Sequence, residues 1–212
     1  VSFTSNPLQS IDLAGCALEE LHLVNTQLGE LTPAACANLE LLRIINVGLD
    51  TIQLNNPALR VFQADYNKFK SLDLSKVPAL TLLELTDNLL ESVDLTALAQ
   101  LEVIDLVSNS LRGTLDFSGQ TMALREIRVQ DNYLTNITGF ANLPGLQLVR
   151  VDQNCIQEHL CAHNATNLGC INPIVDVKCG LSDLKPSAAA SIDTRLAALA
   201  AAIFSLVAAG QV

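Results

Sequence analysis

One spacing of apolar residues recurs along most of the chain. In its clearest copy, Leu80, Leu83 and Leu85 are followed by Asn88 and Leu90, which fits the pattern L-x-x-L-x-L-x-x-N-x-L. The alternation of apolar and polar positions in L-x-L predicts a short strand with one face turned inward. A fixed step between copies predicts a stack of similar coils, each in contact with its neighbours. Copies 21 residues earlier and later are formed by Leu59, Phe62, Ala64, Asn67 and Phe69, and by Leu101, Ile104, Leu106, Asn109 and Leu111.

This repeat is identified as a leucine-rich repeat, so we expect an α/β-type solenoid dominated by short parallel strands. The asparagine position recurs at steps of 20 to 23 residues, which indicates about eight coils. An asparagine there can bind backbone groups that have no partner inside their own coil. Val47 should therefore leave a gap in this ladder, which the neighbouring Asn46 could fill. The ladder positions are Asn6, Thr26, Val47, Asn67, Asn88, Asn109, Asn132 and Asn154.

The second half of most coils carries a shorter apolar pattern, such as Ile52 with Leu54. Only about five or six residues then remain before the next strand, which predicts an extended or 3₁₀ convex side. The coil around Gly113 is longer, and its glycine should allow a bulge. Because Val1 and Phe3 enter the first coil in mid-strand, we expect the missing half-coil and any N-terminal cap to lie upstream.

The C-terminal tail has the order of a glycosylphosphatidylinositol (GPI) attachment signal. Small residues, with Ser187 and Ala188 as attachment candidates, precede a short spacer and the uncharged 17-residue stretch 196–212. A membrane-spanning helix and an ordinary amphipathic helix are the alternatives. The expected parts of the chain are the solenoid at 1–154, a cysteine-rich cap at 155–181, a linker with the attachment region at 182–191, and the hydrophobic signal at 192–212.

Six cysteines favour an oxidising compartment. Cys16 and Cys36 occupy equivalent slots in adjacent coils, where Cα atoms lie about 4.8 Å apart, within the disulfide range. We predict a Cys16–Cys36 bridge, with two independent buried thiols as the alternative. The cap cysteines are expected to form disulfides, in one of three pairings, rather than a zinc site with His159 and His163. These four are Cys155, Cys161, Cys170 and Cys179.

Two sequons and the overall charge bear on localisation and partners. Asn136 and Asn164 begin N-x-T sequences and are predicted glycosylation sites, with Asn136 pointing outward. The chain begins at Val1 without a signal-peptide pattern, so any secretory signal has been removed or lies outside this sequence. The net charge is −10, and no stripe of lysine and arginine is present, which argues against a nucleic-acid partner.

The outward positions of the strands form the predicted concave binding face. Leu41, Val61, Leu82 and Val103 make an apolar column on a face that should meet water, and such a column often marks a binding surface. A preference of strands for apolar residues is the alternative explanation. The next outward column contains Glu84 and Asp105 and has arginines toward its ends. We expect a protein ligand whose cationic groups contact these two carboxylates. The ligand-binding candidates are Leu41, Val61, Leu82, Glu84, Val103, Asp105 and Arg128.

The sequence offers little for catalysis. His22 is the one histidine on the concave face and has no serine or cysteine at a matching position. Glu84 and Asp105 should lie about 5 Å apart, which suits a retaining glycosidase, but surface carboxylates are more often simply solvated. We expect no enzyme activity, no cofactor and no resident metal.

The concave motif, the cap opening with Asn154-Cys155 and the tail together resemble GPI-anchored leucine-rich-repeat surface antigens of protists, such as those of trypanosomatids. The segment Leu72-Asp73-Leu74, followed by Pro78-Ala79-Leu80, is also similar to short repeats of bacterial surface proteins. The resemblance implies a non-enzymatic role in adhesion or recognition at the extracellular face of the plasma membrane, with a lipid anchor as the only membrane contact. A secreted inhibitor or another soluble protein-binding solenoid is the alternative.

Overall fold

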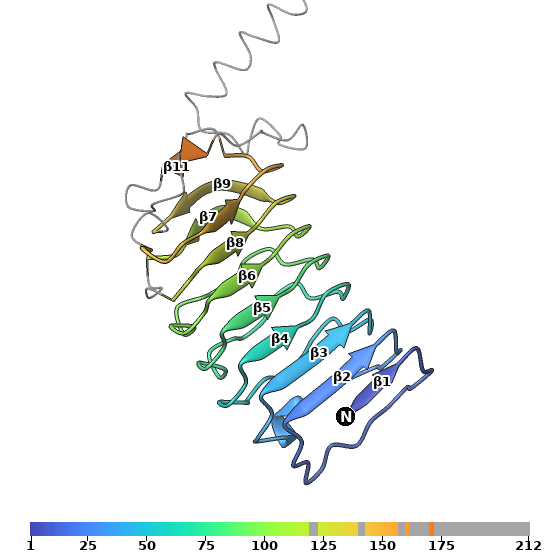
Figure 1. The fold of residues 1–212 in the computed structure, drawn as a ribbon. Coiled ribbons are helices and arrows are strands. Elements are labelled where there is room, and N and C mark those ends of the chain that lie inside the picture. The colour runs from blue at the N-terminus through green and yellow to red at the C-terminus, as the bar shows by residue number, and fades with distance from the viewer. Residues whose placement is uncertain (119–122, 140–142, 157–159, 162–169, 172–212) are drawn as a thin grey trace, which may run out of the picture.

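The computed structural model describes residues 1–118, 123–139, 143–156, 160–161 and 170–171. Eight short strands, one from each coil, form a single parallel sheet along the concave side (Figure 1). This confirms the predicted leucine-rich-repeat solenoid of about eight coils. In sheet order the strands are β1 (Ser2–Thr4), β2 (Glu20–Val24), β3 (Leu41–Ile45), β4 (Val61–Gln63), β5 (Leu82–Glu84), β6 (Val103–Asp105), β8 (Glu126–Arg128) and β10 (Leu148–Arg150).

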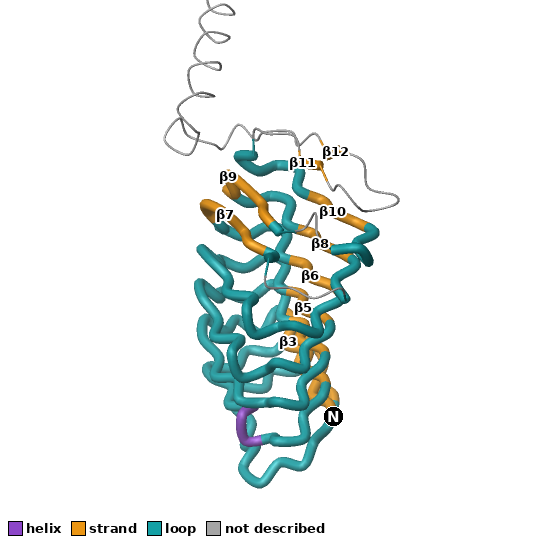
Figure 2. Tube along the Cα trace, turned by 90° about the vertical axis from the view of Figure 1, so that its left-hand side faces the viewer, coloured by secondary structure: helices purple, strands orange, loops and turns teal. Residues whose placement is uncertain are grey.

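The convex side consists mostly of turns and extended segments (Figure 2). Within the described ranges its one helical element is the 3₁₀ helix η1 (Pro33–Ala35), as the short coils predict. Strands β7 (Arg112–Asp116) and β9 (Tyr133–Thr138) form a second parallel pair there. Its register shifts between Gly113 and Thr114, where Gly113 has a φ of 72°, so the expected bulge is present. In the cap, β11 (Leu160–Cys161) pairs antiparallel with β12 (Cys170–Ile171).

Inward side chains of successive coils stack into one continuous core. Each short strand buries its middle residue, such as Phe62 in β4, Leu83 in β5 and Ile104 in β6, and all three are fully buried. The next apolar position of the motif is buried as well, which the period-two alternation predicts. The outward residues are thereby left as the part of each strand that a ligand can reach.

Buried asparagines link the coils through their side chains. The Nδ2 atom of Asn88 donates to the carbonyl oxygens of Ala64, Leu85 and Thr86 at 2.9, 3.1 and 3.3 Å, and its Oδ1 accepts from the Phe69 amide at 3.2 Å. One side chain thus satisfies backbone groups of two coils, as the repeat predicts. The same arrangement holds at the ladder positions Asn67, Asn109, Asn132 and Asn154.

The ladder is interrupted in the N-terminal coils. Thr26 and Val47 are each only 2% exposed, and the Oγ1 atom of Thr26 has no hydrogen-bond partner. Asn46 does not fill the gap, because its Nδ2 donates instead to Oδ1 of Asn25, at 2.9 Å. The expectation that Asn46 compensates is therefore wrong, because this exposed residue lies at the turn and outside the core.

A left-handed residue precedes every ladder position. Eight non-glycine residues have φ between 50° and 58°, and each stands directly before the asparagine slot of its coil. This conformation turns the chain off the strand, and short polar residues adopt it most easily. Tyr66 is the bulky exception. The eight are Ser5, Asn25, Asn46, Tyr66, Asp87, Ser108, Asp131 and Gln153.

Covalent and polar links on the convex side join the coils in which the ladder is missing. Cys16 and Cys36 form a disulfide with a Cα–Cα distance of 4.8 Å, which confirms the prediction. One coil further on, the buried Asn56 donates to the carbonyl oxygens of Pro33 and Cys36 at 2.9 and 2.8 Å. The N-terminal coils are thus held together from the opposite side of the solenoid.

Several predictions concern residues outside the described ranges. Cys155 is disulfide-bonded, but the pairing of the four cap cysteines lies outside the described side chains. Asn164, Ser187, Ala188 and the hydrophobic tail also lie outside the described ranges. Within those ranges, no helix is both long and apolar enough to cross a membrane.

Candidate functional site

The sheet brings all seven predicted ligand-binding residues onto one face. Parallel pairing sets Leu41 beside Val61, Val61 beside Leu82, and Leu82 beside Val103, so the predicted apolar column exists. Beside it runs the predicted central column, which the strand register aligns. Its members in coil order are His22, Arg43, Gln63, Glu84, Asp105, Arg128 and Arg150.

The apolar column is half-buried rather than fully exposed. Neighbouring side chains at strand spacing cover part of one another, which reduces the area that each shows to water. The strongly exposed large apolar residues of the described ranges lie elsewhere: Val1 at 55%, Tyr66 at 57% and Leu89 at 45%. Tyr66 and Leu89 belong to the turns that follow β4 and β5, and the repeat motif does not mark either of them.

Asp105 is already held by groups of this chain. It accepts the Thr86 hydroxyl at 2.9 Å and the Val107 amide at 3.2 Å, and its other oxygen lies 3.6 Å from an Arg128 nitrogen. Arg128 also binds Glu126. Arg128 of this chain thus lies beside Asp105, where the sequence predicts a cationic group of the ligand.

Asp65 and Glu84, at the centre of the face, can each accept further hydrogen bonds. Asp65 accepts the Thr86 amide through Oδ1 at 2.8 Å, and Glu84 accepts the Gln63 amide through Oε2. No described residue donates to the second oxygen of either carboxylate. Partial burial raises the pKa of Asp65 to about 6, and the charges of Glu84 and Asp105 add to the rise. The Thr86 hydrogen bond and Arg43 oppose it.

The pKa of Asp65 is raised because the effect of burial outweighs the opposing effects of the Thr86 hydrogen bond and Arg43. Asp65 is not among the predicted ligand-binding residues, although its column can be read from the register: it follows Ile45 and precedes Thr86 in adjacent coils. What the sequence does not show is the burial that perturbs its titration.

Two polar atoms flank this centre without a partner. Arg43 Nε and Gln130 Oε1 are shielded from solvent and form no hydrogen bond. Both belong to outward positions of the concave side, Arg43 in β3 and Gln130 just after β8. Because both atoms are shielded, the groups that the face offers to a ligand at this centre are the carboxylates of Asp65 and Glu84.

This arrangement suits recognition of a ligand with cationic and apolar groups. Across the ranges that the structure describes, no group of three or more His, Cys, Asp or Glu side chains is arranged to hold a metal ion. The carboxylates can bind cationic groups, and the adjacent apolar column can bury apolar side chains of a ligand.

The predicted glycosylation site at Asn136 lies in β9, away from the concave sheet. Asn136 is half-buried, and its Oδ1 accepts the Ile137 amide at 2.9 Å. The Nδ2 atom, to which a glycan would be attached, has no acceptor among the described residues. Glycosylation at Asn136 stays a prediction.

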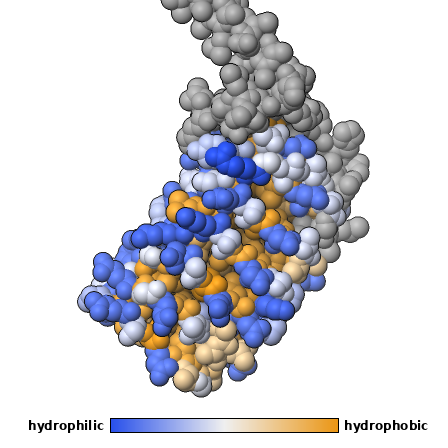
Figure 3. Space-filling model, turned by 180° about the vertical axis from the view of Figure 1, so that it is seen from behind, coloured by the Kyte–Doolittle hydropathy of each residue, from blue (hydrophilic) through white to orange (hydrophobic). Residues whose placement is uncertain are grey.

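The rear of the solenoid has a different surface (Figure 3). Apolar surface runs along its middle between hydrophilic rims. The half-buried apolar residues of the second-half pattern, such as Ile52, Leu72 and Val93, pack against the core on this convex side. They cover the core on the side opposite the concave sheet.

Comparison with known proteins supports the fold. No protein-family model matches the chain, and no curated protein sequence matches it. Among solved structures, the functional domain of InlJ from Listeria monocytogenes, which includes a cysteine ladder, aligns with a TM-score of 0.67 and 22% identity. A leucine-rich repeat protein of Leptospira interrogans aligns with a TM-score of 0.51 and 20% identity.

These alignments, with the observed coils, define the chain as a leucine-rich-repeat protein by fold. The alignments cover 71% and 66% of this chain, but only 33% of the InlJ chain and 44% of the Leptospira chain. At this level of identity they show the fold alone. Both neighbours are bacterial, and the resemblance to protist surface antigens stays a prediction.

Proposed function

We propose that the protein is a non-enzymatic binding module that presents its concave face, from β3 to β8, to a protein partner at a cell surface. The observation that carries the proposal is the pairing of an aligned apolar column with the two carboxylates, Asp65 and Glu84, that keep free oxygens. A face of this kind gives an interface apolar area to bury and charges that orient the partner.

The partner that fits is a protein segment with lysine or arginine next to apolar residues. A cationic group between Asp65 and Glu84 relieves the repulsion between the two carboxylates. Apolar side chains of the partner pack on Leu82 and Val103, which lie in neighbouring strands. The ion pair between Asp105 and Arg128 lies at the border of this region. In it, Arg128 holds the carboxylate of Asp105 in place.

The cell-surface part of the proposal rests on features outside the binding face. The Cys16–Cys36 disulfide fits an oxidising compartment. The tail at 192–212 has the composition of a GPI signal, with the attachment region at 182–191 after the cap. A secreted, soluble inhibitor that uses the same concave face is the second candidate, and it requires a chain without the lipid anchor.

Selection of displayed random peptides on the immobilised protein tests the binding face. We expect enriched peptides to combine lysine or arginine with apolar residues. The double variant Leu82→Ala/Glu84→Lys should weaken such peptides by more than about 2 kcal/mol, because it removes apolar area and reverses the central charge.

The control is Leu89→Ala/Glu91→Lys, the same chemical change at two exposed residues of the adjoining turn. It should leave peptide affinity unchanged. Enrichment of acidic peptides, or equal losses in both double variants, would contradict the proposal.

A further inference from the structure

A second candidate site lies outside the concave face. Where the chain leaves β2, β3 and β4, the turns of three successive coils line an open cavity of about 640 Å³. This edge pocket is located where Thr26 and Val47 interrupt the asparagine ladder. Its lining includes Asn25, Thr26, Gln27, Gly29, Asn46 and Lys68.

The lining presents hydrogen-bonding groups that the fold does not use. The Asn46 Nδ2 donates to the Asn25 Oδ1 at 2.9 Å, which holds both carboxamides in place. Neither the Asn25 Nδ2 nor the Asn46 Oδ1 has a partner among the described residues. Thr26 is 2% exposed, and its Oγ1 is also unpartnered. Because this atom is shielded from solvent, a ligand in the open cavity does not reach it, and the carboxamides of Asn25 and Asn46 carry the polar contacts.

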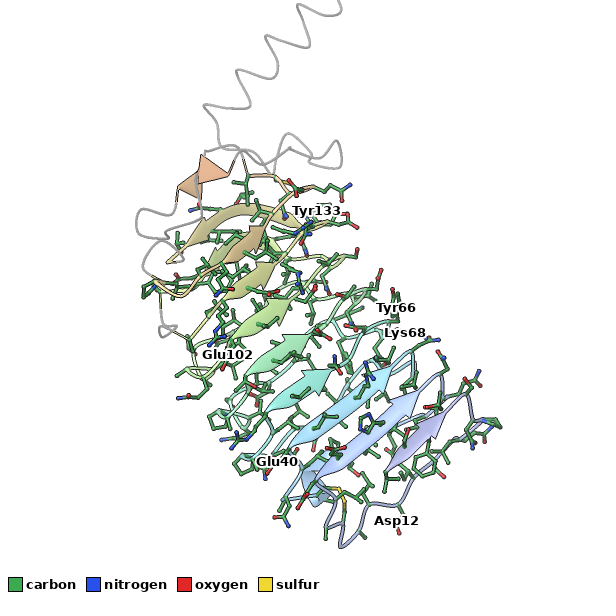
Figure 4. The ribbon with its side chains drawn as sticks, in the orientation of Figure 1. Asp12, Glu40, Tyr66, Lys68, Glu102 and Tyr133 are labelled. Carbon is green, nitrogen blue, oxygen red and sulfur yellow. A yellow bond between two sulfur atoms is a disulfide. The ribbon has the colours of Figure 1, made fainter. Side chains whose placement is uncertain are left out.

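Tyr66 is not part of the lining, but it lies near Lys68, which is. It occupies the turn position that Asn25 and Asn46 hold in the two preceding coils, and it is 57% exposed with a φ of 57°. A bulky residue in this left-handed conformation is strained, and such strain tends to persist at functional sites. Figure 4 places Tyr66 and Lys68 together on the same edge of the solenoid, and Lys68 lines the pocket.

We propose that the edge pocket binds a neutral saccharide, such as the terminal hexose or N-acetylhexosamine of a glycan. Carboxamides can donate to and accept from adjacent sugar hydroxyls. The Tyr66 ring supplies a flat, rigid surface for the C–H face of a sugar, with a hydroxyl at its edge. The cavity volume lies within the usual range for small-ligand sites.

A neutral ligand fits the charges better than an anion. Lys68 is the one charged residue in the lining, and the whole chain carries a net charge of −10. An overall negative field disfavours the approach of polyanions. The ammonium of Lys68 then serves as a donor to a sugar oxygen. The site shares no lining residue with the concave face, so it stands or falls independently of the proposed function.

Gly29→Phe is the variant that blocks the pocket. A Cβ atom at Gly29 meets no other atom within 4 Å, and its φ is not in the left-handed region, so a side chain fits there without backbone strain. Glu91→Phe is the matched control, because Glu91 holds the same turn position three coils further along the chain. Lys68→Ala, at an exposed residue, removes one donor without adding bulk.

Saturation-transfer NMR on the whole chain, with the methyl glycosides of glucose, galactose, mannose and N-acetylglucosamine as probes, tests the proposal. We expect at least one glycoside to bind the wild type and Glu91→Phe equally. Gly29→Phe should weaken it by about tenfold or more and Lys68→Ala by about fivefold, the loss of one good hydrogen bond.

Three results would overturn it. The first is that none of the four glycosides binds the wild type. The second is that Gly29→Phe and Glu91→Phe change glycoside affinity equally. The third is that inorganic phosphate binds at this pocket and no glycoside does. If Gly29→Phe proves unfolded by circular dichroism, Lys68→Ala decides, and unchanged glycoside affinity in that variant counts against the pocket.

Discussion

Asn67 and Val47 hold the same position in consecutive coils, and the Oδ1 atom of Asn67 accepts the Val47 backbone amide at 3.3 Å. The same oxygen accepts the amides of Gly48 and Leu49, at 3.0 and 3.2 Å. Val47 cannot do this for the coil before it. The ladder therefore begins at Asn67, and the coils on its N-terminal side depend on the Cys16–Cys36 disulfide and on Asn56.

Replacing a ladder asparagine should destabilise the solenoid strongly. Asn109 donates to the Leu85 and Leu106 carbonyls at 2.8 and 3.1 Å and accepts the Leu90 amide at 3.0 Å. Asn109→Ala leaves these buried groups unpaired, and we expect a loss of about 2–4 kcal/mol in the free energy of unfolding, measured by urea denaturation. Asn46→Ala, at an exposed turn, is the control and should cost far less; equal losses would contradict this role of the ladder.

Restoring the missing member of the ladder should stabilise the protein. In Val47→Asn the new carboxamide can reach backbone groups of the preceding coil, as Asn67 does for the coil of Val47. We expect a gain of about 1 kcal/mol in unfolding free energy, which urea denaturation can resolve. A loss would mean that the apolar packing of the buried Val47 outweighs the regained hydrogen bonds.

The disulfide should contribute in proportion to the loop that it closes. Cys16 and Cys36 are 20 residues apart in sequence, and closing a loop of this length removes unfolded-state entropy worth about 3 kcal/mol. The double variant Cys16→Ala/Cys36→Ala should unfold at a correspondingly lower urea concentration. Titration of free thiols in the denatured, unreduced wild type is the companion measurement, and two reactive thiols from these residues would show that the bridge is not formed.

Asp65 should make stability fall as pH rises. Its folded pKa, about 6, lies above the ordinary 3.8, so the folded state binds more protons between these values. The contribution of Asp65 is thus fully present below about pH 4 and is lost as pH passes 6. Asp65→Asn should be more stable than the wild type at neutral pH by about 1 kcal/mol, after allowance for solvent screening, with no difference in acid.

Asp73→Asn is the control of opposite sign. Hydrogen bonds from the side chain and backbone of Ser75 lower the pKa of Asp73, so its contribution is present above the ordinary carboxyl pKa and is lost in acid. Urea denaturation across this pH range separates the two effects. A wild type and Asp65→Asn that differ equally at every pH would contradict the assigned titration.

Treatment of intact cells with a phosphatidylinositol-specific phospholipase tests the anchor. A GPI-anchored chain should appear in the medium without the residues that follow Ser187 or Ala188. Retention on the cells with the segment 196–212 intact would contradict the anchor. Appearance in the medium without enzyme treatment would favour the soluble inhibitor.

Much of the candidate site follows from the repeat, but its electrostatics do not. The alignment of Leu82 with Val103 and of Glu84 with Asp105 is predicted by the motif and observed in the sheet. The pairing of Arg128 with Asp105 crosses from β8 to β6, and it changes which carboxylates remain free. The pocket beside Thr26 and the strained Tyr66 belong to turns, for which the repeat specifies spacing but not surroundings.

By itself the sequence determined the solenoid, the inward residues, the register of the strands and the Cys16–Cys36 bridge. The physical reason is that a continuous core requires the same apolar position in every coil, so those positions carry a period. Tertiary structure alone decided that Asp65 is partly buried, that Asp105 is already paired with Arg128, and that three turns line a pocket. The surroundings of outward and turn residues cannot be read from the repeat, because they come from residues of other coils, about 20 positions away in the chain.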